Sequence, residues 1–176
     1  MLKVGKKAPL FKLADQDGKI HTLKDYAGKW ILIYFYPKDD TPGCTKEACM
    51  ITEVYKDFKR QGVVVMGVSK DSVKSHKKFA DKYNLPFTLL SDESTEMIQK
   101  YGVWGEKKMR GKTYLGTHRV SYLVSPDGLI AKVYPDVDPA NHALELLADI
   151  KNFKKEERKA AKAAANTINS TMTHRA

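Results

Sequence analysis

The stretch Trp30-Ile31-Leu32-Ile33-Tyr34-Phe35-Tyr36-Pro37 decides the fold of this chain. Every position before the proline is apolar or aromatic, which is typical of a strand buried on both faces of a sheet. Pro37 ends the strand because proline has no N–H to give to a strand ladder. The chain then passes directly into a loop with the sequence Lys38-Asp39-Asp40-Thr41-Pro42-Gly43-Cys44.

The loop leads into a predicted helix over residues 42–60. Thr41 has the residue type of an N-cap, and Pro42 fits the first helical position, so Cys44 falls at the third. Apolar residues then recur at helical spacing, and Gly62 follows as a stop signal. A helix N-terminus favours a thiolate, because its unpaired N–H groups and its dipole are positive. The sequence therefore places one sulfur where an anion is stabilised.

Strands and helices alternate beyond this helix. Residues 63–69 and 86–90 are predicted strands, and residues 71–83 and 93–101 are predicted helices. Such alternation predicts a largely parallel sheet that is covered by helices.

Two β-hairpins are expected on either side of this core. Residues 11–23 predict one hairpin, with Asp17-Gly18 as its turn. Residues 119–124 and 129–134 predict the other, around Ser125-Pro126-Asp127-Gly128. The second hairpin introduces antiparallel strands.

The remaining segments are assigned to a loop and a last helix. Residues 102–116 are polar and contain glycine, so we expect a loop that carries Trp104 over the surface. Pro139 is expected to open a helix whose core-facing stripe is Ala143, Leu146, Leu147, Ile150 and Phe153. Residues 154–165 can continue as an Ala/Lys helix, and residues 166–176 are expected to fray. The prediction is a domain over residues 1–153 and a basic C-terminal tail over 154–176, partly helical and partly disordered.

Composition places the chain among globular domains. It has 176 residues, of which 42% are hydrophobic and 30% charged, which favours one domain with a sizeable core. No apolar run has the length of a signal peptide or a membrane span, so the cytoplasm is the expected compartment and no membrane partner is expected. Two cysteines do not make the framework of a small secreted domain, which favours redox cycling in a reducing compartment.

The net charge of +10 raises the question of nucleic-acid binding. Residues 154–176 hold six Lys or Arg and two Glu, a net of +4, which leaves +6 for residues 1–153. No aromatic residues alternate with the lysines as a single-strand stacking platform would require. We therefore expect a solvated basic surface and no nucleic-acid partner.

Cys44 and Cys49 are the only cysteines, and helix geometry keeps them apart. Residues five apart on a helix have Cα atoms about 8.6 Å apart and point ~140° away from each other. A disulfide needs Cα atoms about 4.4 to 6.8 Å apart. If the two sulfurs bond, the helix must locally unwind, so the thiol and disulfide forms would differ in conformation.

Other interpretations of the two cysteines remain open at this point. Both could be small core residues, which fits Cys49 better than Cys44, because Ala48 and Val54 are its apolar neighbours. A zinc site is disfavoured, because Cys-x4-Cys lacks a second pair of ligands. The histidines show no paired spacing either; they are His21, His76, His118, His142 and His174.

The loop and helix start resemble a known family. Pro37, Thr41 and Cys44 match the peroxiredoxin pattern Pro-x-x-x-Thr-x-x-Cys. With Cys49 five residues on, the segment is similar to the peroxiredoxin Q, or bacterioferritin comigratory protein, branch. The resemblance runs from about residue 4 to residue 153. It implies a thioredoxin-like α/β fold of peroxiredoxin type, with a central mixed sheet flanked by helices and an N-terminal β-hairpin extension.

The resemblance also implies a reaction and its residues. Cys44 would be the peroxidatic thiolate that attacks a peroxide oxygen and becomes a sulfenic acid. Cys49 would be the resolving thiol that forms an intramolecular disulfide, which thioredoxin or a similar dithiol would reduce. The substrates would be hydrogen peroxide and organic hydroperoxides. The expected role is antioxidant defence and redox homeostasis, by a protein that is expected to be a monomer.

Three further residues receive roles by the same resemblance. Thr41 would cap the helix and direct its hydroxyl toward the peroxide or the sulfur, and Pro37 would shape the loop and exclude water. Arg119 would favour the thiolate of Cys44 and polarise the O–O bond. Glu47, one turn after Cys44, could oppose a thiolate or orient Arg119. No metal, haem or flavin is expected, because thiolate, arginine and helix end supply the nucleophile and the electrostatics.

Two other functions compete with a peroxidase. A general disulfide oxidoreductase would share the fold, but should carry Cys-x-x-Cys at the helix start, which the spacing of Cys44 and Cys49 does not match. A non-enzymatic basic interaction module, whose thiols only report redox state, is the other alternative.

Overall fold

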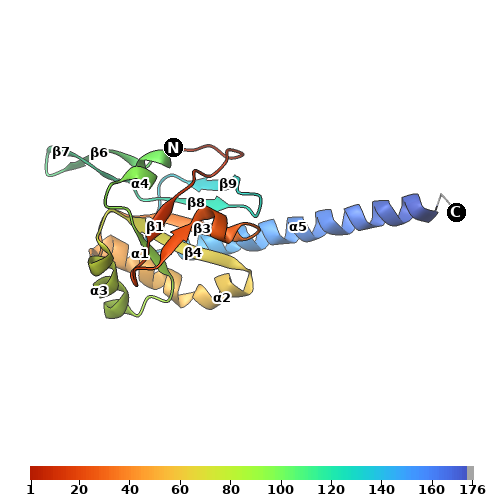
Figure 1. Ribbon diagram of the computed structural model, residues 1–176, viewed down its shortest axis with the longest axis horizontal. Coiled ribbons are helices and arrows are strands. Elements are labelled where there is room, and N and C mark those ends of the chain that lie inside the picture. The colour runs from red at the N-terminus through yellow and green to blue at the C-terminus, as the bar shows by residue number, and fades with distance from the viewer. Residues whose placement is uncertain (174–176) are drawn as a thin grey trace.

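The computed structural model describes residues 1–173, built around a seven-stranded sheet with the order β2-β1-β5-β4-β3-β8-β9 (Figure 1). Its strands are β1 Lys12–Ala14, β2 Ile20–Thr22, β3 Trp30–Phe35, β4 Val63–Ser69, β5 Thr88–Ser91, β8 Val120–Val124 and β9 Ile130–Tyr134. The strand that decides the fold, β3, lies between β4 and β8, and all six of its residues are buried. The prediction of a strand buried on both faces is confirmed.

The sheet is mixed. The pairs β3–β4 and β4–β5 are parallel, whereas β1–β2, β1–β5, β3–β8 and β8–β9 are antiparallel. The mixed sheet that the resemblance implies is confirmed. The largely parallel sheet expected from alternation holds only for the three central strands, because both predicted hairpins join the same sheet at its two ends.

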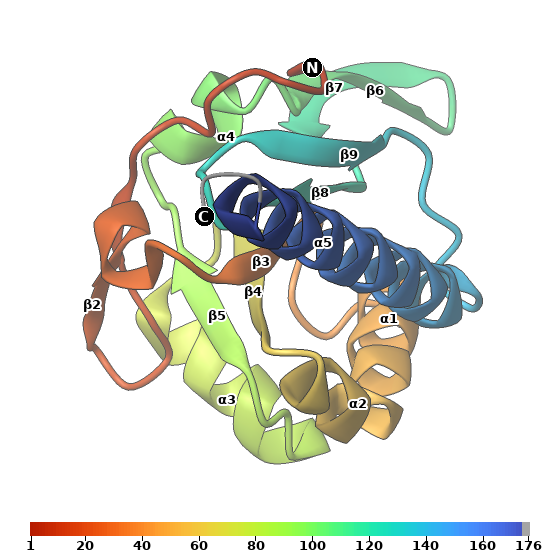
Figure 2. The ribbon, with the colours of Figure 1, turned by 90° about the vertical axis from the view of Figure 1, so that its right-hand side faces the viewer.

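Helices cover both faces of the sheet, as Figure 2 shows. One core cluster contains Trp30, Leu32 and Tyr34 and packs beneath α1 Pro42–Glu53, α2 Tyr55–Arg60, α3 Val73–Tyr83 and α5 His142–Thr173. The alternate residues Ile31, Ile33 and Phe35 pack on the other face, with α4 Glu96–Lys100 and the 3-10 turn η1 Leu23–Tyr26. This alternation follows from the two-residue period of a strand.

All four predicted helices differ in their boundaries, and those over residues 71–83 and 93–101 shorten to Val73–Tyr83 and Glu96–Lys100. The helix expected over residues 42–60 is divided at Val54 into α1 and α2. Thr52 donates its hydroxyl to the Ala48 carbonyl at 2.8 Å, an arrangement that bends helices. The last helix begins at His142 rather than at Pro139, because the Asp138 side chain accepts hydrogen bonds within a turn over residues 138–141.

The segment expected to be a loop is a two-stranded antiparallel hairpin. Its strands are β6 Trp104–Met109 and β7 Lys112–Thr117, joined by Arg110 and Gly111, which both have positive φ (51° and 75°). A tight two-residue hairpin turn needs positive φ at both of its central residues. The prediction of a loop over residues 102–116 is wrong. Trp104 is half-buried against the core rather than carried over the surface.

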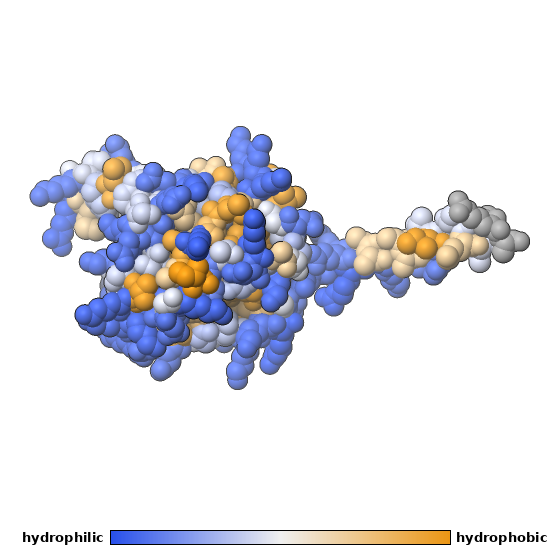
Figure 3. All heavy atoms as spheres, viewed as in Figure 1, coloured by the Kyte–Doolittle hydropathy of each residue, from blue (hydrophilic) through white to orange (hydrophobic). Residues whose placement is uncertain are grey.

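Helix α5 runs from the core into solvent at the end of the molecule opposite the β6–β7 hairpin (Figure 1). Its predicted stripe is confirmed: Phe153 packs on Trp30, whose indole N–H donates to Glu157 at 3.0 Å. Residues 155–173 are exposed, and residues 163–173 carry no charged side chain (Figure 3). The helix extends to Thr173, farther than the predicted fraying from residue 166, and residues 174–176 of that prediction lie outside the described part. None of the helices in residues 1–173 combines the length and apolar character needed to cross a bilayer.

Candidate active site

Cys44 lies in the first turn of α1, at the end of β3. Thr41 is the N-cap and Pro42 the first residue of the helix, as predicted. The Cys44 side chain is only 2% exposed, yet it lies at a hollow of about 680 Å³. The structure thus places a nearly buried sulfur beside the positive end of a helix, at a cavity open to a small ligand.

Arg119 joins Cys44 to Glu47. It immediately precedes β8, and β8 pairs with β3, which brings the guanidinium across the start of α1. Nη2 donates to Cys44 Sγ at 3.2 Å, and Nη1 donates to Glu47 Oε2 at 2.7 Å. The predicted neighbourhood of Cys44 and Arg119 is thus present, and Glu47 orients the arginine.

Gly43 makes this approach possible. A Cβ at this position would lie 3.0 Å from Nη2 of Arg119 and 3.7 Å from its Cζ. A side chain here would press on the guanidinium and shift it by a few tenths of an ångström. The absence of a side chain at Gly43 therefore leaves Arg119 room beside the sulfur.

The charges of the site follow from burial. Burial raises the pKa of Glu47 to about 7, although Arg119 opposes that change. Its second oxygen, Oε1, has no hydrogen-bond partner among the described residues. Cys44 and Glu47 in turn raise the pKa of Arg119 against its desolvation, so the arginine stays charged. Arg119 thus places a fixed positive charge in contact with Sγ of Cys44.

Thr41 and Pro37 line the same hollow, but Thr41 does not cap by its side chain. Its hydroxyl donates to the Lys38 carbonyl at 2.8 Å, and no helix N–H donates to it. The predicted side-chain cap is therefore wrong, while the position at the N-cap is correct. Because the hydroxyl hydrogen is engaged, the oxygen of Thr41 is left to accept a hydrogen bond in this form.

Cys49 lies on the same unbroken helix as Cys44, and both are free thiols. It is half-buried and does not line the hollow. Burial raises the pKa of Cys49, and the neighbouring Glu53 raises it further. A disulfide between the two requires α1 to unwind, as the helix geometry predicts.

The β6–β7 hairpin forms a wall of the hollow that the sequence analysis missed. It contributes apolar residues together with a half-buried lysine, Lys107, whose Nζ donates to the Thr117 carbonyl at 3.0 Å. Burial and the charge of Arg119 lower the pKa of Lys107, whereas Cys44 raises it. Lys107 is thus a second cation near the sulfur. The Arg110-Gly111 turn was the signal that could have identified this hairpin.

A second network joins the loop over residues 37–41 to α3. Ligand atoms of Asp39, Asp71 and His76 converge within 4.8 Å, the one such group among the described residues that could hold a metal ion. Hydrogen bonds already engage these atoms: those of Asp39 and His76 bond to each other, and Asp71 accepts from Ser69. We therefore treat the group as a hydrogen-bond network. The sequence analysis placed His76 only on a core-facing stripe, because its partners are distant in the chain.

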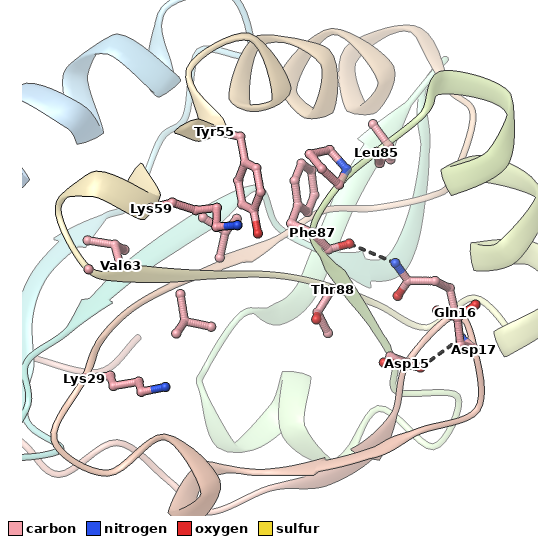
Figure 4. Close-up of a pocket in the computed structure, with 14 residues that line it drawn as sticks. Asp15, Gln16, Asp17, Lys29, Tyr55, Lys59, Val63, Leu85, Phe87 and Thr88 are labelled. Atoms are coloured by element: carbon pink, nitrogen blue, oxygen red, sulfur yellow. Dashed lines mark hydrogen bonds between the residues drawn. The ribbon is translucent and has the colours of Figure 1, made fainter. Parts of the chain in front are cut away.

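A second hollow of similar size lies elsewhere. A cavity of about 710 Å³ is lined by residues that include Asp15, Lys29, Tyr55 and Phe87 (Figure 4). It contains neither cysteine. Within it the Gln16 side chain donates to the Phe87 carbonyl at 2.8 Å. Thiol chemistry therefore belongs to the hollow at Cys44.

Comparison with known proteins gives a family match over most of the chain. A model of the AhpC/TSA family matches residues 4–133. A putative peroxiredoxin bcp of Coxiella burnetii is 48% identical over 146 residues, which cover 83% of this chain and 97% of the relative. Peroxiredoxin Bcp of Escherichia coli is 48% identical over 141 residues, covering 80% of this chain and 90% of the relative.

Solved structures agree with these relatives. One is the bacterioferritin comigratory protein of Xanthomonas campestris, described for its alkyl peroxide reduction activity. It superposes with a TM-score of 0.78 at 39% identity, over 82% of this chain and 92% of that one. A cysteine-to-serine mutant of the PrxQ of Xylella fastidiosa superposes with a TM-score of 0.83 at 31% identity, over 87% and 98%.

Proposed function

Because the chain belongs to the AhpC/TSA family, within its peroxiredoxin Q or Bcp branch, we propose that it reduces hydrogen peroxide and organic hydroperoxides through Cys44. The observation that carries the proposal is the 3.2 Å contact from Arg119 Nη2 to Cys44 Sγ at the helix start. A charge-assisted donor of this kind stabilises the anion that must attack.

The first half of the reaction uses the thiolate, the arginine and the hollow. The Cys44 thiolate attacks one peroxide oxygen, the O–O bond breaks, and the other oxygen leaves with its electron pair. That oxygen takes a proton and departs as water or alcohol, and Cys44 becomes a sulfenic acid. Arg119 contacts the sulfur, and in this mechanism it also stabilises the negative charge that develops on the leaving oxygen. Thr41 can accept a hydrogen bond from the peroxide, and Pro37 closes the loop side of the hollow.

The second half requires a change of conformation. Cys49 attacks the sulfenic sulfur, which gives a disulfide and releases water, after α1 has unwound. Burial raises the pKa of Cys49 in the folded helix, so unwinding also frees the resolving thiol to ionise. A reduced thioredoxin or a similar dithiol then clears the disulfide by exchange.

The setting of the reaction is part of the proposal. We propose that the protein acts as a monomer without a nucleic-acid partner, in the cytoplasm, where dithiols are kept reduced. Residues 1–153 form the catalytic domain, and residues 154–176 form a tail outside it. Trp30 of the domain donates a hydrogen bond to Glu157, four residues past this boundary. The beginning of the tail is therefore attached to the domain.

Stopped-flow oxidation of the reduced protein by hydrogen peroxide tests the proposal. We expect Cys44→Ser to abolish the fast reaction. The matched variant Cys49→Ser should be oxidised as fast as the parent, but should stop at the sulfenic acid and fail to turn over with thioredoxin. If Cys44→Ser consumes peroxide at the parent's rate, the assignment of Cys44 is wrong.

A further inference from the structure

The cysteine loop, residues 37–41, is attached to α3 by a buried aspartate. The Asp39 carboxylate accepts hydrogen bonds from Tyr36 Oη at 2.6 Å, from Ser75 Oγ at 2.8 Å and from His76 Nδ1 at 2.7 Å. The side chains of Asp39 and His76 are 4% and 0% exposed. Three side-chain donors thus hold the Asp39 carboxyl group in place.

His76 is bonded on both sides. Its Nε2 lies 3.0 Å from the Leu90 carbonyl, while Nδ1 faces Asp39. His76 therefore bridges the Asp39 carboxylate and the backbone of β5, and its side chain is fully buried between them. A buried polar group that loses its hydrogen-bond partner keeps the cost of its desolvation, so this contact resists opening.

Three more hydrogen bonds reinforce the attachment. The Asp39 backbone N–H donates to the Asp71 carboxylate at 3.0 Å. On the exposed side, the Asp40 carboxylate accepts from Lys82 at 2.7 Å and from Tyr83 at 2.6 Å. Asp40 has a φ of 55°, so the loop bends through a left-handed conformation while both ends of α3 hold it.

We propose that the loop latch, defined as Asp39, Ser75 and His76, sets how often α1 opens for disulfide formation, with His76 as its positioning residue. The loop connects β3 to α1, so while the latch is closed only α1 itself can unwind. With the latch released, residues 37–40 can move as well, and Cys44 gains the freedom to reach Cys49. The inference rests on the proposed function, because it concerns the step that follows oxidation of Cys44.

The two steps respond differently to a weaker latch. When the closed form dominates, a tenfold larger equilibrium constant for opening hardly changes the population of the closed form. The rate of the reaction with peroxide therefore stays nearly constant. The open form becomes about tenfold more populated, which accelerates resolution by the same factor. We expect a change of about this size for His76→Gln. The loss of one hydrogen bond to a carboxylate changes such an equilibrium constant about tenfold.

The chain provides a matched control. His21 is also buried, and its Nε2 lies 2.7 Å from Asp15, with Tyr26 as a further hydrogen-bond partner. That cluster belongs to β2 at the edge of the sheet, with β1, β5 and β4 between it and β3. His21→Gln therefore removes a similar His–Asp pair without touching the cysteine loop.

Rapid mixing of each reduced variant with hydrogen peroxide separates oxidation from resolution, and mass spectrometry measures sulfinic acid on Cys44 at excess peroxide. We expect His76→Gln to be oxidised within about twofold of the parent's rate, to resolve about tenfold faster, and to form less sulfinic acid. His21→Gln should match the parent in all three. Ser75→Ala removes one donor to Asp39 and keeps the contact between His76 and Asp39, so it should shift resolution in the same direction even if His76→Gln does not fold.

The outcomes that overturn the latch are distinct. Equal resolution rates in the His76 and His21 variants would refute it, as would equal rates in Ser75→Ala and the parent if the His76 variant does not fold. A parallel fall of oxidation and resolution in His76→Gln would also refute it, because general loss of structure produces that pattern. If Cys44 of the parent is not oxidised, the proposed function fails first and the latch fails with it.

Discussion

Arg119 performs two tasks with one guanidinium. One nitrogen contacts the Cys44 sulfur, and the other contacts the Glu47 carboxylate, while Gly43 leaves room for the group. The family resemblance predicted the first contact, and residue spacing left the role of Glu47 open. Residue spacing could not decide the role of Glu47, because that role depends on Arg119. The two residues lie 72 positions apart in the chain, and only the fold brings them into contact.

Glu47 makes stability depend on pH. Burial raises its pKa from 4.5 to about 7, so the folded state binds a proton that the unfolded state releases between these values. This stabilisation is complete below pH 4.5 and is lost as pH rises through about 7, at most about 3 kcal/mol. We expect the stability of the parent relative to Glu47→Gln to fall over this interval in urea unfolding. The exposed Glu53→Gln on the same helix should show no such trend, and a flat difference for Glu47→Gln would contradict the prediction.

Among the elements, the β6–β7 hairpin is the one whose sequence pattern did not predict its structure. Its charged, glycine-containing strands resemble a loop, and no apolar alternation reveals the pairing from Trp104 and Thr117 to Met109 and Lys112. The apolar strands β3 and β4 were predictable because burial dictates their composition. The hairpin instead lies largely on the surface and forms one wall of the active-site hollow.

Lys107 tests the contribution of this hairpin to the reaction. Its charge lies near Cys44 and Arg119, and it is half-buried, so screening by water is incomplete. We expect Lys107→Met to lower the rate constant of Cys44 oxidation about threefold, less than a charge in direct contact would contribute. Lys108→Met is the control, because adjacent strand residues face opposite sides and Lys108 is exposed. Equal rates for the two variants would exclude a role for Lys107.

For the whole molecule, the sheet order explains why distant segments meet at one site. The central position of β3 sets α1 at its carboxyl end, and antiparallel β8 returns Arg119 to the same end. Alternation of strands and helices predicted the layers, whereas the His76 network escaped prediction because its members come from separate loops and helices. The division at residue 153 into domain and tail stays a prediction, although α5 continues as one helix to Thr173.

The central claim is that Cys44 and Cys49 form a redox pair whose cycle opens α1. Peptide mapping by mass spectrometry after one equivalent of hydrogen peroxide tests it most directly. We predict a Cys44–Cys49 linkage within single protein chains, which the helix of the thiol form cannot contain. Recovery of both cysteines as thiols, or a linkage only between different chains, would contradict the account.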